Sequence, residues 1–232
     1  MRPNYEIELL CPPFRAPDSR VDQLIGMLED AVGERLAFEM TPYGEVPPVN
    51  ERAALIADSL LGRRWADPKL ILVNGTKQEV VAYISAIDGQ TVGPMHERWA
   101  GALWLALCIP KASFSGDLLS LLLRLGAVAE VEIGTIGPVV KRDELSGTLF
   151  SDGDPTRVPL AWHNVWSARV ARYHGFPQPG DEGHLAAICW SPQRTHVAFT
   201  VTADPIDTRS PDHRAIIAWF DARFGIQNPP QS

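Results

Sequence analysis

The histidines, cysteines and carboxylates of this 232-residue chain lack the spacing of a metal site. There is no Cys-x-x-Cys and no His-Glu-x-x-His, and no two of the six histidines lie four residues apart. Zinc sites depend on such ligand spacings. Asp181 and His184 lie close in the sequence, and Asp152 and Asp154 flank a glycine, but each group is only a fragment of a calcium-type loop. The sequence therefore predicts no metal site.

Nucleophilic and phosphate-binding motifs are incomplete in the same way. Ser115 precedes a glycine, but Ser113 stands where the G-x-S-x-G elbow of hydrolases needs its first glycine. Neither glycine-rich loop used to bind nucleotides occurs. We therefore predict a protein that is not an enzyme and binds no cofactor.

One enzymatic alternative stays open, a small hydrolase that uses carboxylates and histidines of the 141–184 loops. A pocket lined by Asp152, Asp154, Asp181 and His184 with shifted pKa values would favour it.

The formal net charge of -7 is concentrated near the amino terminus. Residues 1–50 hold four arginines and nine acids, so their balance is 4 - 9 = -5. Nucleic acids and anionic membranes need a basic footprint, which argues against both as partners. A basic protein is a compatible partner, and an acidic face kept only for solubility is the alternative. The acids predicted to contact a partner are Asp22, Glu29, Asp30, Glu34 and Glu45.

Two tryptophans, Trp162 and Trp166, are the aromatic candidates for partner binding. Tryptophan is enriched among the residues that dominate interface energetics. If these side chains are exposed, we expect them to anchor a partner, and if they are buried they belong to the core.

The elements that position these residues are arranged around an apolar stretch at 99–135. A strand is predicted at 100–109. A helix is predicted to start within 113–117, with Ser115 as its N-cap, and to stop at Gly126. A strand at 131–135 follows, with Glu130 and Glu132 on a solvent face.

Further strands are predicted at 5–11, 36–40, 70–73 and 80–87, with a hairpin at 185–190 and 197–201. Helices are predicted at 19–33, at 50–62 and at 211–224, the last with Ser210 as cap. A further helix is predicted at 162–175, because Trp162, Val165, Trp166, Val170 and Tyr173 share helical spacing.

Short turns between strands favour an α+β fold with a mixed, largely antiparallel β-sheet flanked by α-helices. Residues 1–232 are predicted to form a single domain, with a candidate subdomain boundary in the polar 141–160 loop. The amino terminus shows no export leader, and no apolar run reaches about 18 residues. The three separated cysteines suit reduced thiols, so we expect a cytoplasmic protein.

Two stretches, PLAWHNVW at 159–166 and ADPIDTRSPDHRAIIAWFDARFG at 203–225, resemble the polymorphic-toxin immunity proteins of group fifty-two. The apolar helix and strand at 117–136 also fit this family, and the order of elements agrees over most of the chain. Members are encoded beside toxins with a restriction-endonuclease-like nuclease domain, including type VI secretion effectors.

The resemblance implies a cytoplasmic inhibitor that binds one cognate toxin and protects the producing cell and its kin in bacterial competition. Such a toxin has a basic groove for DNA, which the acidic surface of the inhibitor would occupy. A non-enzymatic adaptor without any toxin is the remaining alternative.

Overall fold

The computed structural model describes residues 4–12, 19–33, 36–39, 69–74, 80–86, 103–110, 116–137 and 160–224. These residues form a nine-stranded sheet in the order β2-β3-β4-β5-β1-β6-β7-β9-β8, and every pairing is antiparallel. The strands are β1 (Asn4–Cys11), β2 (Leu36–Glu39), β3 (Lys69–Asn74), β4 (Val80–Ala86), β5 (Leu103–Pro110), β6 (Ile133–Ile136), β7 (His163–Ser167), β8 (Ala187–Trp190) and β9 (His196–Thr200). The helices are α1 (Ser19–Val32), α3 (Leu118–Ala129), α4 (Ala168–Tyr173), the 3-10 turn η4 (Asp181–His184) and α5 (Pro211–Phe224).

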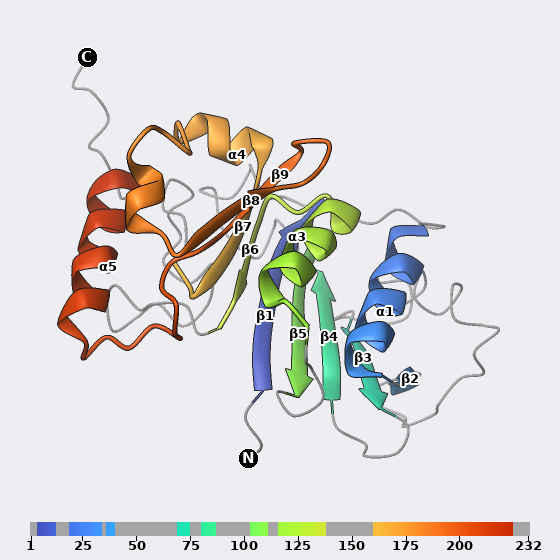
Figure 1. The fold of residues 1–232 in the computed structure, drawn as a ribbon. Helices are drawn as coiled ribbons and strands as arrows, with labels where there is room; N and C mark the ends of the chain where they lie inside the picture. The colour runs from blue at the N-terminus through green and yellow to red at the C-terminus, as the bar shows by residue number, and fades with distance from the viewer. Residues whose placement is uncertain are drawn as a thin grey trace.

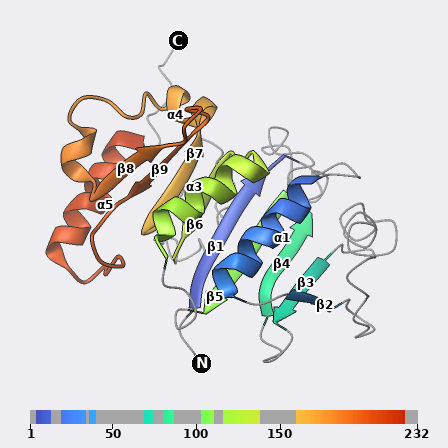
Figure 2. The same cartoon turned by 45° about the vertical axis from the view of Figure 1, so that its right-hand side comes forward.

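The sheet separates two groups of helices, which gives the predicted α+β class (Figure 1). Helices α1 and α3 lie side by side on one face of the sheet (Figure 2). Helix α5 lies beside β8 and β9, the strands at one lateral edge of the sheet. None of the described helices is long and apolar enough to cross a membrane. The sheet runs without interruption from β6 to β7, the strands on either side of the 141–160 loop, and that loop itself lies outside the described residues.

Strand β1 lies near the middle of the sheet because its sequence alternates. Ile7 and Leu9 point to the face covered by α1 and α3, and both are fully buried. Leu10 points to the other face and joins the aromatic core around α5. The first core is mainly aliphatic, whereas the second holds Trp166, Phe176, Phe199, Phe220 and Phe224.

Helix α3 confirms the predicted helix but corrects both of its ends. The cap is Asp117, not Ser115, because the Asp117 side chain accepts a hydrogen bond from the Leu119 N–H. Gly126 is not the stop, since the helix runs to Ala129 and ends where Glu130 adopts φ 53°. A Cβ on Gly126 would lie 3.0 Å from a methyl carbon of Val165, so this glycine permits close packing of α3 on β7.

The strand predicted at 131–135 is also corrected, since β6 begins at Ile133 and all four of its residues are buried. Both edges of β6 are paired and α3 packs on it, which leaves no solvent face. The helix predicted at 162–175 is wrong over its first half, where β7 forms instead. Pairing with β6 and β9 overrides the helical spacing, and only α4 is helical.

The carboxyl-terminal predictions are confirmed. Strands β8 and β9 form the predicted hairpin, and α5 begins at Pro211 with the Ser210 hydroxyl 3.5 Å from the His213 N–H. Gly175 ends the α4 segment with φ 58°, a conformation that favours glycine. The predicted 50–62 helix lies outside the described residues.

Candidate partner-binding edge

One end of the sheet gathers acidic side chains from segments that are far apart in the sequence. In the register of the sheet, Asn4 pairs with Pro110, and His163 pairs with both Ile136 and Thr200. The first residues of β1 and β7 therefore lie at the same end of the sheet as the last residues of β5, β6 and β9. Helix α3 also begins here, because it follows β5. We call this end the acidic edge and define it by Asp117, Trp162, His163 and Asp204.

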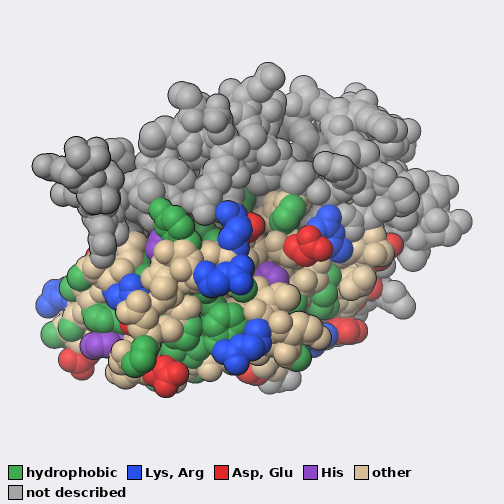
Figure 3. Space-filling model, turned by 90° about the horizontal axis from the view of Figure 1, so that it is seen from above, with side chains coloured by type: hydrophobic (Ala, Val, Ile, Leu, Met, Phe, Trp, Pro, Cys, Tyr) green, Lys and Arg blue, Asp and Glu red, His purple; other side chains and the backbone are tan. Residues whose placement is uncertain are grey.

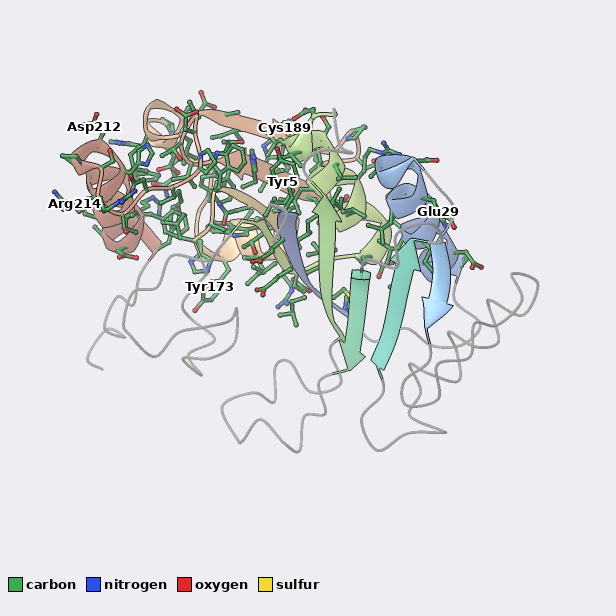
Figure 4. All side chains as sticks on the ribbon, turned by 90° about the horizontal axis from the view of Figure 1, so that it is seen from below. Tyr5, Glu29, Tyr173, Cys189, Asp212 and Arg214 are labelled. Atoms are coloured by element: carbon green, nitrogen blue, oxygen red, sulfur yellow. The ribbon has the colours of Figure 1, made fainter. Side chains whose placement is uncertain are left out.

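The two carboxylates of the acidic edge are open to solvent. Asp117 and Asp204 are exposed, and neither forms an ion pair with another described residue. Figure 4 looks onto this end of the molecule, with Tyr5 at the start of β1. These side chains therefore present negative charge outward without a cation of the described chain to neutralise it.

Asp117 is fixed in place by its role as helix cap. One carboxylate oxygen accepts the Leu119 N–H at 3.0 Å and the other accepts the Ser120 hydroxyl at 2.5 Å. These hydrogen bonds, that of Ser120 above all, lower the pKa of Asp117 below its ordinary value. The carboxylate is consequently ionised and held in one orientation at neutral pH.

The aromatic side of the acidic edge is built by two neighbouring rings. The centroids of the Trp162 and His163 rings lie 4.1 Å apart. The half-buried Trp162 donates its indole N–H to the Thr202 carbonyl at 2.8 Å, and the Thr202 hydroxyl donates to the Asp204 carbonyl at 2.6 Å. This chain of hydrogen bonds fixes the backbone that carries the Asp204 carboxylate.

His163 lies beneath this surface and is neutral at pH 7. Burial lowers its pKa to about 4, and the nearby Asp117 carboxylate opposes that shift. Its Nδ1 lies 2.9 Å from the Thr200 hydroxyl, whereas its Nε2 is buried and has no hydrogen-bond partner. Buried polar atoms without a partner are uncommon in proteins, so this nitrogen marks the edge as unusual.

The five acids that the sequence predicts to contact a partner differ in exposure and in their place on the molecule. Asp22 and Asp30 are exposed on α1, but they lie near its opposite ends, and only Asp30 is at the end of the sheet that carries the acidic edge. Glu29 is buried, with 8% of its surface exposed. Glu34 and Glu45 lie outside the described residues.

The two predicted tryptophans also separate. Trp162 borders the acidic edge and keeps part of its surface accessible. Trp166 is fully buried, and its ring centroid lies 5.1 Å from that of Phe176, 5.0 Å from that of Phe199 and 5.2 Å from that of Phe224. Trp166 is therefore a core residue, and of the two tryptophans Trp162 is the one that a partner can reach.

Among the carboxylates named for the hydrolase alternative, Asp181 is the one that the structure describes, and it is held in a network of hydrogen bonds. Asp181 is buried and accepts hydrogen bonds from the Arg223 Nε at 3.3 Å and the Gln178 N–H at 2.7 Å. Arg223 also donates to the carbonyls of His174 and Gly175. We call this network, which ties α5 to the 174–184 segment, the C-terminal latch.

Of the remaining residues of that alternative, the structure describes His184. The His184 ring stacks on Trp219 at 4.5 Å, and Asp152 and Asp154 lie outside the described residues. No group of three or more described histidines, cysteines or carboxylates is arranged to hold a metal ion.

The opposite end of the sheet carries arginines, several of them paired. Arg20 lies 3.1 Å from Glu130, and Arg169 lies 2.9 Å from Glu132. Arg172 is exposed, and the exposed Arg194 lies over the Trp190 ring at 5.1 Å. Figure 3 looks onto this end and shows Lys and Arg side chains gathered on its described part. Exposed arginines are therefore found at the end of the sheet opposite to the acidic edge, together with the exposed acids Asp22 and Glu130.

No family model and no curated protein sequence matches the chain. Among solved structures, the fold is similar to that of the Pseudomonas aeruginosa T6SS protein PA0821, a protein of a type VI secretion system. The TM-score is 0.61 at 13% sequence identity, and the match covers 97% of this chain and 73% of PA0821. At this identity the likeness to PA0821 concerns the fold.

Sequence reasoning missed Asp117 and Asp204 as residues of one end of the sheet. The sequence predicts Asp117 only as part of a helix start. The common location follows from the strand pairing, which brings the ends of β5 and β9 to the same end of the sheet. The available signal was the position of each acid at the end of an element, and it becomes useful only once the pairing is known.

Proposed function

We propose that this chain is an immunity protein that binds and neutralises a cognate nuclease-type toxin of a type VI secretion system in the producing cell. The observation that carries the proposal is the acidic edge, where exposed carboxylates and a partly accessible tryptophan lie at the same end of the sheet. The resemblance of 159–166 and 203–225 to immunity proteins and the similarity in fold to a type VI secretion protein support it.

The chemistry of inhibition follows from charge. A nuclease must present basic side chains to the phosphates of its substrate, so a surface of fixed carboxylates competes for the same groups. Opposite charges accelerate association, and an aromatic side chain that becomes buried in the interface slows dissociation. The chain supplies both features, and inhibition then needs only a stable complex.

The proposal is tested by cell survival. The nuclease-type toxin encoded beside this chain is expressed from an inducible promoter in a host bacterium, with and without the chain. The proposal expects growth to be restored by the chain and not by an unrelated acidic protein of similar size. An inactivated toxin serves as the control for expression load.

Two outcomes would contradict the proposal. Cells that die equally with and without the chain, while both proteins are present in soluble form, would exclude neutralisation. Protection from an unrelated nuclease to the same degree would indicate a general effect on nucleases rather than immunity to one cognate toxin.

A further inference from the structure

We propose that the free edge of strand β8 is a homodimer interface, at which β8 of one copy pairs antiparallel with β8 of a second copy. The proposal goes beyond the neutralisation of a toxin and does not depend on it. Strand β8 (Ala187–Trp190) is the last strand in the order of the described sheet, and Figure 2 shows it as the outermost strand at that side. Its inner side pairs with β9, and no described strand pairs with its outer side.

The backbone of β8 directs hydrogen-bonding groups out of the sheet. The Ser191 N–H donates to the His196 carbonyl at 2.9 Å, so the backbone of Ser191 faces the β9 side. Along an antiparallel strand, successive residues direct their backbone groups alternately to one side and to the other. Cys189 therefore faces β9, as Ser191 does. Ile188 and Trp190 direct their N–H and C=O groups to the outer side.

The edge is accessible and lacks the side chains that usually keep a sheet edge unpaired. Ala187 is exposed and the other three residues of β8 are half-buried, whereas all five residues of β9 are buried. Sheet edges are commonly protected by charged residues, particularly lysine, or by proline. The sequence of β8, AICW, contains neither a charge nor a proline. The edge is therefore suited to the addition of a further strand.

A second copy of this chain fits the edge because β8 is complementary to itself. In a dimer with two-fold symmetry, a contact from residue i to residue j is repeated from j to i. Ile188 of one copy can pair with the partner's Trp190, and each such pair exchanges both of its N–H to C=O hydrogen bonds. Symmetry forms the pair twice, so every outward-facing backbone group of β8 is used.

This register places Cys189 opposite the partner's Cys189 at the two-fold axis. The two cysteines then form a non-hydrogen-bonded pair, in which the Cα atoms lie about 4.5 Å apart. Both side chains are on the same face of the joined sheet, the face covered by α3, because Cys189 packs against the core on that side.

Charge complementarity favours the same register. The antiparallel arrangement brings the turn after β8 of one copy, which carries Arg194, alongside the segment before β8 of the other, which carries Glu182. Both side chains are exposed, and neither forms an ion pair with another described residue. The η4 turn that holds Glu182 is bound to α5 through Asp181 and Arg223. The Arg194 guanidinium lies over the Trp190 ring, which packs with the core beside α5, so both charges are on the α5 side of the sheet.

Hydrogen exchange of single backbone amides tests the pairing. Exchange in the purified chain is followed by NMR at low and at high protein concentration, and the same samples are examined by analytical ultracentrifugation. The Ile188 and Trp190 amides are expected to be protected in the dimer and to exchange at least about tenfold faster on dilution. The Cys189 amide, which faces β9, is the matched control and is expected to stay protected at both concentrations.

A cysteine cross-link tests the register. Cys189 is a free, half-buried thiol, and Cα atoms about 4.5 Å apart are within the range that a disulfide bridges. Diamide oxidises two neighbouring thiols to a disulfide and is itself reduced. Wild type is expected to form a covalent dimer in its presence. Cys189→Ala is expected to form none, while it still associates without a covalent bond.

Charge reversal tests the proposed pair of Glu182 and Arg194. Glu182→Arg and Arg194→Glu are each expected to raise the Kd of the dimer about tenfold, because each places like charges opposite one another at two symmetric positions. The double variant restores opposite charges and is expected to return Kd to within about twofold of wild type. Circular dichroism and thermal unfolding establish that each variant is folded.

Four results would overturn the proposal. A chain that sediments as a monomer at every concentration excludes the dimer. A dimer in which Ile188 and Trp190 exchange as fast as in the monomer, or in which Cys189 does not cross-link, uses another surface or register. Single charge reversals that leave Kd unchanged exclude the pairing of Glu182 with Arg194 and with it this register. Protection of Ile188 and Trp190 that appears only after a toxin is added would assign the β8 edge to a strand of the toxin.

Discussion

The acidic edge and the C-terminal latch use the same kind of side chain for opposite purposes. In the latch, Asp181 is buried and both of its oxygens accept hydrogen bonds, one of them from Arg223. At the acidic edge, Asp117 is exposed and faces no cation of the described chain. A saturated carboxylate stabilises the fold and has nothing left for a partner, whereas an open carboxylate is available for recognition.

Substitutions in the two regions should therefore affect different quantities, the stability of the fold in one and the affinity for the toxin in the other. Changes in the latch should lower the free energy of unfolding and leave the Kd of the folded protein intact. Changes that remove only charge at the acidic edge, such as Asp117→Asn, should raise Kd and leave the free energy of unfolding nearly intact.

Arg223→Ala is expected to have the largest effect, a loss of about 3 kcal/mol in the free energy of unfolding. The substitution leaves Asp181 buried without its cation and removes the donors to the His174 and Gly175 carbonyls. Urea unfolding followed by tryptophan fluorescence measures the loss. A variant that stays within about 0.5 kcal/mol of wild type would mean that the latch is not a stabilising network.

Acidification is expected to destabilise the fold by about 2 kcal/mol through His163. The pKa of His163 is lowered to about 4 by burial, from an ordinary 6.5, and Asp117 is the charged group that acts on it. The unfolded chain therefore binds the proton first. The stabilisation is fully present above pH 6.5 and is lost as the pH falls toward 4. His196, whose pKa burial also lowers, acts in the same direction.

The pH prediction is checked by melting temperature as a function of pH in wild type and His163→Gln, which cannot be protonated. The variant should show a shallower decline between pH 6.5 and 4. Identical slopes in the two proteins would exclude His163 as a source of the acid sensitivity.

Asp117→Ala is expected to cost about 1 kcal/mol of stability, whereas Asp117→Asn should cost little, because asparagine also caps helices well. The Leu119 N–H and the Ser120 hydroxyl both depend on the Asp117 side chain. Both variants should weaken toxin binding equally. A variant series in which binding follows the cap rather than the charge would show that Asp117 acts only by holding α3.

The smallest effect is expected at the opposite end of the sheet. Breaking the Arg169–Glu132 pair with Arg169→Ala should change stability by less than about 0.5 kcal/mol, because Arg169 is half exposed. Toxin affinity should stay within about twofold of wild type. A marked loss of affinity would move the interface to this end and break the contrast between the two ends.

The local elements were largely predictable from the sequence. Alternation along β1, the amphipathic pattern of α1 and the proline at the start of α5 each predicted an element that the structure contains. The segment at 163–167 was mispredicted because a five-residue strand paired on both sides needs no local strand pattern. Long-range strand pairing determines the secondary structure of such a segment, and this pairing cannot be predicted from the local pattern of a single sequence.

The candidate site was predictable only in part. Trp162 and Asp30 were named from composition and spacing, and they lie at or near the acidic edge. Trp166 and Glu29 are also predicted from the sequence but are buried, and Trp166 lies on β7 rather than on the predicted helix. The placement of Asp117 and Asp204 at one end of the sheet depends on the order of the strands.

The central claim is that this chain neutralises a nuclease by occupying its basic surface, and inhibition of DNA cleavage by the purified proteins tests it most directly. The nuclease-type toxin that the proposal assigns as the cognate partner is titrated with wild-type chain and with the double variant Asp117→Asn, Asp204→Asn. The account predicts that wild type abolishes cleavage near equimolar amounts and that the variant needs far more. Cleavage that continues in the presence of excess wild-type chain would contradict it.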